Sequence, residues 1–342
     1  MARFSLMRSL ARRVGAAVAG VFLVFIALEG LVRLRHRNFV VESRLPVRRT
    51  TTPRASYDSL LGWVPRPGYF APGHQEPWTV LDGGLRGNGA PIQSTRQPIL
   101  TLGDSFTFGD EVGDADTWPA QLQRELETPV LNGGVFAYGV DQAYLRGMQL
   151  LREHQPGLVL LAFISDDVAR AEFSHYYAWK PYYEYSEGGL TLRNVPVPTG
   201  EGPQPHLGTL RKALSYSLFA SAVLPRIAHG WWYHGFIERK HRDGEAVTVE
   251  LLVRLDEFVR SKGARFVVIT LATNGRIGDD QRVPGVADGA RRRGVEVLDL
   301  QPEISELASD STLFMPAGHY GPALNGLVAS RIARYVASNV GR

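Results

Sequence analysis

The sequence of 342 residues contains no cysteine, which excludes disulfide bonds, thiolate-bound zinc, cysteine-ligated iron–sulfur clusters and a cysteine nucleophile. Charged residues make up only 21% of the chain and hydrophobic residues 44%, so the composition excludes wholesale disorder and supports a sizeable core. The net charge is only +4, and no nucleic-acid-binding motif is present. We therefore expect no nucleic-acid partner. The histidines show no metal-ligand spacing, and we expect no metal or cofactor.

One long apolar run stands near the amino terminus, at residues 14–32 between Arg13 and Arg33. It reads VGAAVAGVFLVFIALEGLV and contains one ionisable side chain, Glu29. A helix of this length is roughly 28 Å long, close to the thickness of a bilayer core. A cleavable signal peptide is the alternative, but no small-x-small cleavage site follows the run. We therefore predict a membrane anchor over residues 1–33.

The rest of the chain predicts a single α/β domain behind a connecting segment. Residues 34–95 are interpreted as a stalk followed by a Gly/Pro-rich pre-domain segment of loops and turns. From residue 96 to 342, short apolar runs alternate with amphipathic stretches, which is typical of βαβ units in a parallel sheet covered on both faces. Residues 170–245 interrupt this alternation and are interpreted as an aromatic-rich insertion. The predicted strands are 99–102, 129–131, 158–163, 265–271 and 295–299, and the predicted helices are 117–127, 141–154, 250–262, 286–293 and 322–338.

The strongest chemical signal is the nucleophile segment, residues 102–109, which reads LGDSFTFG. A strand there ends in a glycine turn, and Ser105 begins the next element. In a parallel sheet this geometry exposes a serine at the carboxyl end of a strand, where its own N–H can point at a developing oxyanion. An ordinary serine in a βα turn is the alternative for this segment taken alone.

Three further segments follow in chain order. The glycine segment, residues 132–142, reads NGGVFAYGVDQ and suits either close backbone approach to a substrate or a simple turn. The third-strand segment, residues 164–167, reads ISDD and offers polar groups for an oxyanion or a helix cap. The histidine segment, residues 318–320, carries His319, which suits a general base at neutral pH or a structural role.

In this order the four segments resemble the SGNH (GDSL) hydrolase superfamily, and the chain is most similar to its membrane-anchored bacterial branch. Residues 27–34 (ALEGLVRL), 84–87 (GLRG) and 180–183 (KPYY) add to the resemblance. The resemblance implies a flavodoxin-like three-layer sandwich with a parallel sheet, in addition to the transmembrane helix. It implies that Ser105 is the nucleophile and His319 its base. It also implies an oxyanion hole formed by the N–H groups of Ser105 and Ala137 and the side chain of Asp166.

Three positions depart from the family pattern. The family usually has an aspartate two or three residues before the histidine, where this chain has Pro316 and Ala317. His319 is therefore expected to lack a carboxylate, to borrow one such as Asp299 or Asp310, or to use a backbone carbonyl. Two further substitutions concern the oxyanion hole: Ala137 replaces a glycine and Asp166 replaces an asparagine. An ionised Asp166 would repel an oxyanion, so it is protonated, turned away or misaligned with the family residue.

The leading hypothesis is a membrane-anchored serine esterase that hydrolyses an O-acyl bond of a small molecule, lipid or glycan. An O-acyltransferase acting on an envelope glycan is the second, since the insertion carries aromatic residues that suit stacking on sugars: Tyr176, Tyr177, Trp179, Tyr182, Tyr183 and Tyr185. A catalytically inactive scaffold or binding protein is the third. The family resemblance implies a single-pass protein whose domain is periplasmic or otherwise extracytoplasmic, although arginines flank the apolar run on both sides and the positive-inside rule does not support export.

Overall fold

The computed structural model describes residues 2–37, 39–43, 54–71, 76–176, 178–200, 208–232, 237–275 and 282–338. The chain divides into two compact units. The smaller unit comprises Met1–Arg48 and Pro203–Ile237, and the larger unit comprises Arg49–Gly202 and Glu238–Arg342.

The larger unit is built on a five-stranded sheet whose neighbouring strands all run parallel. Its strands in chain order are β5 (Ile99–Leu102), β6 (Val130–Asn132), β7 (Leu158–Phe163), β13 (Arg265–Thr270) and β14 (Val297–Asp299). The spatial order β14-β13-β7-β5-β6 reads 2-1-3-4-5 from the other edge, which is the flavodoxin-like order. The predicted parallel α/β fold is confirmed. The strand order reverses between β5 and β7, and such a switch point is where open α/β sheets bind ligands.

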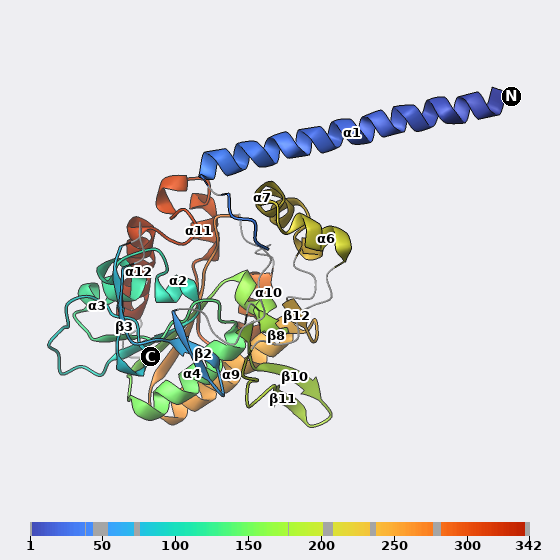
Figure 1. Ribbon diagram of the computed structural model, residues 1–342. Helices are drawn as coiled ribbons and strands as arrows, with labels where there is room; N and C mark the ends of the chain where they lie inside the picture. Colours follow the sequence, from blue (N-terminus) through green and yellow to red (C-terminus); the bar gives the residue numbers. More distant parts are fainter. Residues whose placement is uncertain are drawn as a thin grey trace. The chain divides into compact units, whose positions relative to one another are not determined.

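Helices cover both faces of this sheet and give three layers (Figure 1). Alternate side chains of β7 explain the arrangement, because Val159, Leu161 and Phe163 belong to one apolar cluster, whereas Leu158, Leu160 and Ala162 belong to another. The first cluster packs under α4 (Val140–Glu153), α9 (Gly244–Ser261) and α10 (Arg282–Arg292), and the second under α3 (Trp118–Leu126), α11 (Gln301–Leu307) and α12 (Pro322–Ser338).

The helix boundaries follow local signals where those exist. Thr117 caps α3, since its side chain accepts a hydrogen bond from the N–H of Ala120 at 3.2 Å. Two helices begin earlier than the apolar spacing predicts: α9 at Gly244 and α10 at Arg282. The first turns of both contain small or polar residues that carry no periodic signal but pack against the rest of the unit.

The pre-domain segment contains more structure than the loops and turns expected from its glycines and prolines. Two short antiparallel pairs form there, and the glycines mark their ends. Trp63 and Trp78 are each only 2% exposed and belong to a third apolar cluster, so this segment packs as part of the larger unit. Its elements are β1 (Ala55–Asp58), β2 (Gly62–Pro65), β3 (Gly68–Phe70), β4 (Trp78–Val80) and the 3₁₀ turn η1 (Asp82–Gly84).

The aromatic-rich insertion is fastened by one buried lysine. Lys180 is completely buried, and its ammonium group donates to the Asp141 carboxylate and to the carbonyls of Arg170, Phe173 and Pro181. Asp141 lies in the first turn of α4, so the ion pair joins the insertion to the main sheet layer. The strands of this region are β8 (Phe173–Tyr176), β9 (Ala178–Trp179), β10 (Tyr182–Ser186), β11 (Gly189–Arg193) and β12 (Ile237–Arg239).

The smaller unit is helical. Its helices are α1 (Ala2–His36), α6 (Thr209–Leu214), α7 (Leu218–Ile227) and α8 (His229–Trp232). Among the described residues, one helical stretch is long and apolar enough to cross a membrane, Arg12–Arg35, with a mean hydropathy of 2.3 and none of its apolar window buried. A signal sequence near the amino terminus has the same length and composition.

The buried ion pair makes a stability prediction. Replacing Lys180 with Met leaves the Asp141 carboxylate buried without its partner, which costs about 3–5 kcal/mol of unfolding free energy. Urea unfolding of the full chain in detergent, followed by tryptophan fluorescence, measures this change. The matched control is Lys240→Met, because Lys240 forms a half-exposed pair with Glu238 that contributes about 0–1 kcal/mol. Equal losses in both variants would contradict the anchoring role of Lys180.

Candidate active site

Ser105 lies at the first position of a four-residue helix directly after β5. This helix, α2 (Ser105–Phe108), is capped by Asp104, whose side chain accepts a hydrogen bond from the N–H of Phe106 at 2.9 Å. Gly103 has φ +150°, and a Cβ atom there would lie 2.3 Å from Thr107 Oγ1 and 2.5 Å from the Ala162 carbonyl oxygen. Only glycine fits this turn, which places Ser105 at the switch point of the sheet with 7% of its surface exposed.

His319 faces this serine from the loop that precedes α12. The loop is closed by backbone hydrogen bonds from Met315 N–H to the His319 carbonyl and from Gly318 N–H to the Met315 carbonyl, both 2.8 Å. His319 Nε2 lies 3.0 Å from Ser105 Oγ. The structure therefore brings together the two residues that the sequence motifs select, at a distance suited to proton transfer.

The carboxylate behind the histidine is Glu111. Its Oε2 lies 2.8 Å from His319 Nδ1, and its Oε1 accepts a hydrogen bond from the N–H of Ala317 at 2.9 Å. The two aspartates considered from the sequence serve elsewhere. Asp299 accepts from the hydroxyl of Thr270 and the N–H of Gln301, and Asp310 caps the turn η3 (Ser311–Leu313). Of the three alternatives left open by the sequence, a borrowed carboxylate is the one found, but it comes from Glu111, a residue that the sequence motifs do not indicate.

Charge and burial oppose each other in this histidine–glutamate pair. Burial pushes the pKa of Glu111 upward, but the hydrogen bonds from the His319 ring and from Ala317 outweigh it and hold that pKa below its usual value. Burial pushes the pKa of His319 downward. The Glu111 hydrogen bond and the charges of Asp110, Asp104 and Glu111 outweigh this effect and raise the pKa of His319 above its usual value. An ionised Glu111 therefore stabilises the imidazolium form.

Glu111 reaches His319 because the chain reverses just after the nucleophile helix. Gly109 has φ +83° and Glu111 has φ +73°, both in the left-handed region. The N–H groups of Gly109 and Asp110 both donate to the Ser105 carbonyl, at 2.9 and 3.1 Å. Ser105 and the carboxylate that contacts His319 are thus only six residues apart in the chain. The left-handed conformation at Glu111 is a strained one for a non-glycine residue, and it occurs here beside the reacting groups.

Two arginines of the pre-domain segment hold this reversal. Arg54 pairs with Asp110 at 2.8 Å. Arg86 pairs with Asp114 and donates to the Val112 carbonyl at 3.0 Å. Arg86 is 1% exposed, and burial lowers its pKa to about 9. The short GLRG motif around Arg86 therefore contributes a positioning residue for the loop that carries Glu111.

The backbone next to Ala137 lies against the nucleophile turn. Val135 N–H donates to the Gly103 carbonyl at 3.0 Å, and the Tyr138 carbonyl is joined to Asp104 through one nitrogen of Arg170. Ala137 itself has φ +62°, where a side chain is strained. Among the described residues, neither the N–H of Ser105 nor that of Ala137 donates to another protein group. Both are therefore available to an oxyanion.

Asp166 faces an arginine. Its Oδ2 lies 3.6 Å from Arg170 Nη2, while Nη1 of the same guanidinium lies 2.7 Å from Asp167 Oδ1 and 3.2 Å from Asp104 Oδ2. When ionised, a carboxylate has no proton to donate, so in that form Asp166 would not be an oxyanion donor. Asp167 instead caps α5 (Ser165–Arg170) by accepting from the N–H of Ile164 at 3.1 Å. Burial and the nearby Asp104 raise the pKa of Asp167, while Arg170 opposes this shift.

The insertion aromatics mostly pack against protein. Tyr183 is 7% exposed and meets Tyr144 edge-on, and the Tyr176 ring lies under the Arg170 guanidinium at 5.2 Å. Tyr185, at 48% exposed, is the clearest candidate for outside contact among the described members of this group. Tyr177 lies outside the described residues.

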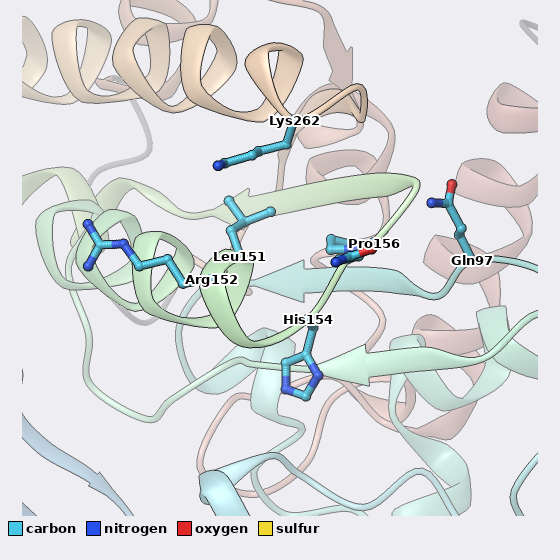
Figure 2. Close-up of a pocket in the computed structure, with 7 residues that line it drawn as sticks. Gln97, Leu151, Arg152, His154, Pro156 and Lys262 are labelled. Atoms are coloured by element: carbon cyan, nitrogen blue, oxygen red, sulfur yellow. The ribbon is translucent and has the colours of Figure 1, made fainter.

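Two surface hollows lie at opposite ends of the sheet. A hollow of about 370 Å³ borders the histidine loop and is lined by Asn274, Phe314, Met315 and neighbouring residues. The other, of about 380 Å³, is shown in Figure 2 with Gln97, His154 and Lys262 among its lining residues. Gln97 precedes β5 and Lys262 precedes β13, so this second hollow lies at the amino ends of the strands, away from Ser105. The lining of the first hollow includes Met315 and Pro316 of the loop that carries His319, whereas Ser105, His319 and Glu111 line neither hollow.

The arrangement joins the Ser105 hydroxyl to one ring nitrogen of His319 and the other ring nitrogen to the Glu111 carboxylate, beside the N–H groups of Ser105 and Ala137. These are the parts needed for acyl transfer through a covalent acyl-serine. Among the described residues no group of three histidine, aspartate or glutamate side chains is placed to hold a metal ion.

No family model and no curated protein matches the chain. Solved structures that match include a putative lipolytic protein of the G-D-S-L family from Desulfitobacterium hafniense, at 14% identity and TM-score 0.37, covering 70% of this chain and 99% of that one. The psychrotrophic esterase EstA from Pseudoalteromonas matches at 11% identity and TM-score 0.44, covering 72% and 100%. An acetyl xylan esterase from Geobacillus stearothermophilus matches at 15% identity and TM-score 0.42, covering 73% and 99%. Because identities and TM-scores are low, function must rest on the geometry of the site.

The Glu111 contact predicts a pH effect on the reactivity of Ser105. The base acts only when His319 is neutral, so a raised pKa places the acid limb of the rate profile above the ordinary histidine value of about 6.5. Glu111→Gln removes the charge, moves this limb to lower pH and lowers the plateau rate by about 10³–10⁴-fold. Phosphonylation of Ser105 by a fluorophosphonate, followed from about pH 5 to about pH 9, measures both effects.

Asp310→Asn is the matched control for this experiment, because asparagine also caps a turn and Asp310 does not contact His319. Its profile is expected to equal that of the parent. A profile for Glu111→Gln that also equals the parent would show that Glu111 does not act on the histidine.

The strained backbone at Ala137 makes a second prediction. Ala137→Gly relieves the left-handed strain and keeps the N–H, so unfolding free energy rises by up to about 1 kcal/mol. Reactivity of Ser105 stays within a few-fold of the parent. Thermal unfolding and fluorophosphonate labelling of the same sample measure the two quantities. Ala143→Gly, within the regular helix α4, is the contrasting control and is expected to lose about 1 kcal/mol. A loss at Ala137 of the same size would contradict the strain.

Proposed function

We propose that this protein is a serine ester hydrolase that cleaves an O-acyl bond through Ser105 and His319. The observation that carries the proposal is the continuous chain of contacts from Ser105 Oγ to His319 Nε2 at 3.0 Å and from His319 Nδ1 to Glu111 at 2.8 Å. A catalytically inactive scaffold has no need for a buried carboxylate behind its histidine. The presence of Glu111 therefore favours an enzyme.

The proposed reaction proceeds in two halves. Ser105 Oγ attacks the ester carbonyl carbon while its proton passes to His319 Nε2, and the resulting oxyanion accepts hydrogen bonds from the N–H groups of Ser105 and Ala137. The imidazolium then protonates the alcohol oxygen as the ester bond breaks, leaving an acyl-serine. Water repeats the sequence, giving up one proton to His319, and the acid leaves as Ser105 recovers its hydroxyl hydrogen. Glu111 stays ionised throughout and orients the ring.

We further propose that residues 1–33 anchor the protein in a membrane and that the larger unit is extracytoplasmic. The support for the anchor is the apolar helix Arg12–Arg35, whose length matches a bilayer core. The proposed substrates are acylated small molecules, lipids or glycans available to a membrane-bound enzyme.

The test is hydrolysis of p-nitrophenyl acetate by the full chain in detergent. Ser105→Ala and His319→Ala are each expected to lower the rate by about 10³-fold or more, because each removes a member of a unit that acts together. Ser261→Ala, an exposed serine at the end of α9, is the matched control and should retain the parent rate. Equal rates in all four proteins would overturn the assignment of an esterase.

A further inference from the structure

A carboxylate of the proposed anchor helix caps a second apolar helix in the smaller unit. Glu29 accepts hydrogen bonds from the Ser217 hydroxyl at 2.6 Å and from the N–H groups of Leu218 and Phe219 at 3.1 and 2.9 Å. The Ser217 hydroxyl oxygen in turn accepts from the N–H of Ala220 at 2.9 Å. The N–H groups in the first turn of a helix have no partner within the helix and usually bond to water. The first three N–H groups of α7 instead donate to protein side chains.

The charge of this cap is also balanced within the smaller unit. Arg33 donates to Glu29 at 2.6 Å and to the carbonyls of Val40 and Tyr216 at 3.1 and 2.9 Å. One turn further into the apolar run, the rings of Phe25 and Phe219 meet edge-on at 5.8 Å. Polar groups satisfied internally beside an aromatic contact are what a helix pair requires where water is scarce.

The α6–α8 segment, residues 209–232, exposes several large apolar side chains. Ile227 is 74% exposed, Leu210 is 66% and Trp231 is 43%. The sequence of α7, LFASAVLPRI, holds a single charged residue, and only Ala220 within it is buried. Exposed apolar side chains gathered on one short segment indicate an interaction surface.

We propose that the α6–α8 segment is seated in one leaflet of the membrane beside α1 and that lipid acyl chains cover its exposed apolar side chains. This rests on the proposed anchor. A ten-residue helix is about 15 Å long, half of a bilayer core, so α7 is too short to cross the bilayer and would lie within one leaflet with both ends near its interface. Tyr216 and Trp231, just outside its two ends, are residues that favour the interface, and Lys212 and Arg226 have long stems that carry their charges to headgroups.

Lipid is favoured over other occupants because the surface continues from α1, in whose apolar window no residue is buried. The hydrogen bonds from Ser217, Leu218 and Phe219 to Glu29 hold the start of α7 at the level of Glu29, within the apolar run. A water-exposed α7 would not need these amides to be paired by a carboxylate of another helix.

The absence of cysteine allows a direct test with single-cysteine variants of the full chain. Nitroxide labels are placed at Ile227→Cys, at Val21→Cys within the anchor and at Asp288→Cys on the exposed surface of α10. The proteins are reconstituted in vesicles of phosphatidylcholine and phosphatidylglycerol. Collisions with oxygen, which concentrates in lipid, are compared with collisions with a water-soluble nickel complex. Labels at Ile227 and Val21 are expected to favour oxygen, and the label at Asp288 is expected to favour nickel.

The other possible results of the labelling experiment would each contradict a different part of the proposal. A nickel-accessible Ile227 beside a lipid-exposed Val21 would overturn the seating of α7 and leave the anchor standing. A nickel-accessible Val21 would overturn the anchor as well, and p-nitrophenyl acetate hydrolysis by the same samples would show that the catalytic proposal is separate. Spin–spin broadening at Ile227 that disappears on dilution with unlabelled protein would assign the surface to a second copy of the chain instead of lipid.

Glu29→Ala and Glu29→Gln test the cap itself in the Ile227→Cys background. Alanine leaves the amides of Leu218 and Phe219 and the Ser217 hydroxyl without acceptors, so the oxygen preference at Ile227 is expected to be lost. Glutamine keeps an acceptor oxygen and should retain most of that preference. An unchanged preference in Glu29→Ala would show that the Glu29 contacts do not seat α7.

Discussion

The hydrogen bond between Glu111 and His319 is the interaction on which the site depends. It fixes the imidazole so that Nε2 faces Ser105, and it favours the charged form of the ring that the proposed acyl transfer would generate. Because Glu111 follows the nucleophile by only six residues, one short loop sets the positions of both. The second carboxylate oxygen also receives the N–H of Ala317, so the same side chain ties the histidine loop to the nucleophile loop. The Glu111 side chain therefore both orients the His319 ring and holds the two loops of the site together.

The pre-domain segment contributes to the candidate active site because it supports the loop that carries Glu111. Arg54 and Arg86 hold the loop on both sides of Glu111, through Asp110 and Asp114. The buried guanidinium of Arg86 lies over the rings of Trp78 and Phe108, at 5.4 and 5.2 Å, so its position is fixed by packing as well as charge. A segment that reads as loops from its composition thus supports the strained backbone at Glu111.

The sequence predicts those features that depend on local pattern. The five parallel strands, the glycine turn before Ser105 and the identity of His319 all follow from short runs of residues, and the structure brings Ser105 and His319 together. Glu111 could not be found this way, because its role depends on two left-handed residues, Gly109 among them, that reverse the chain in three dimensions. The GLRG motif marks Arg86 but not its partners Asp114 and Val112, and no motif distinguishes Arg170 from the many other arginines. Asp299 and Asp310 were plausible from proximity along the chain, yet nearby hydroxyl and amide groups engage both.

Arg170 balances part of the negative charge of the acidic residues near the proposed oxyanion site. Asp104, Asp166 and Asp167 all approach its guanidinium, and Asp104 directly precedes the nucleophile. Three unpaired carboxylates would oppose a developing negative charge on the substrate. Arg170 offsets part of this charge, because its guanidinium lies within 2.7–3.6 Å of all three carboxylates. Since the same guanidinium also binds the Tyr138 carbonyl, it aligns the backbone that presents Ala137 N–H. In the proposed reaction, a carboxylate at position 166 would leave stabilisation of the oxyanion to backbone N–H groups, and Arg170 would make this acidic edge compatible with acyl transfer.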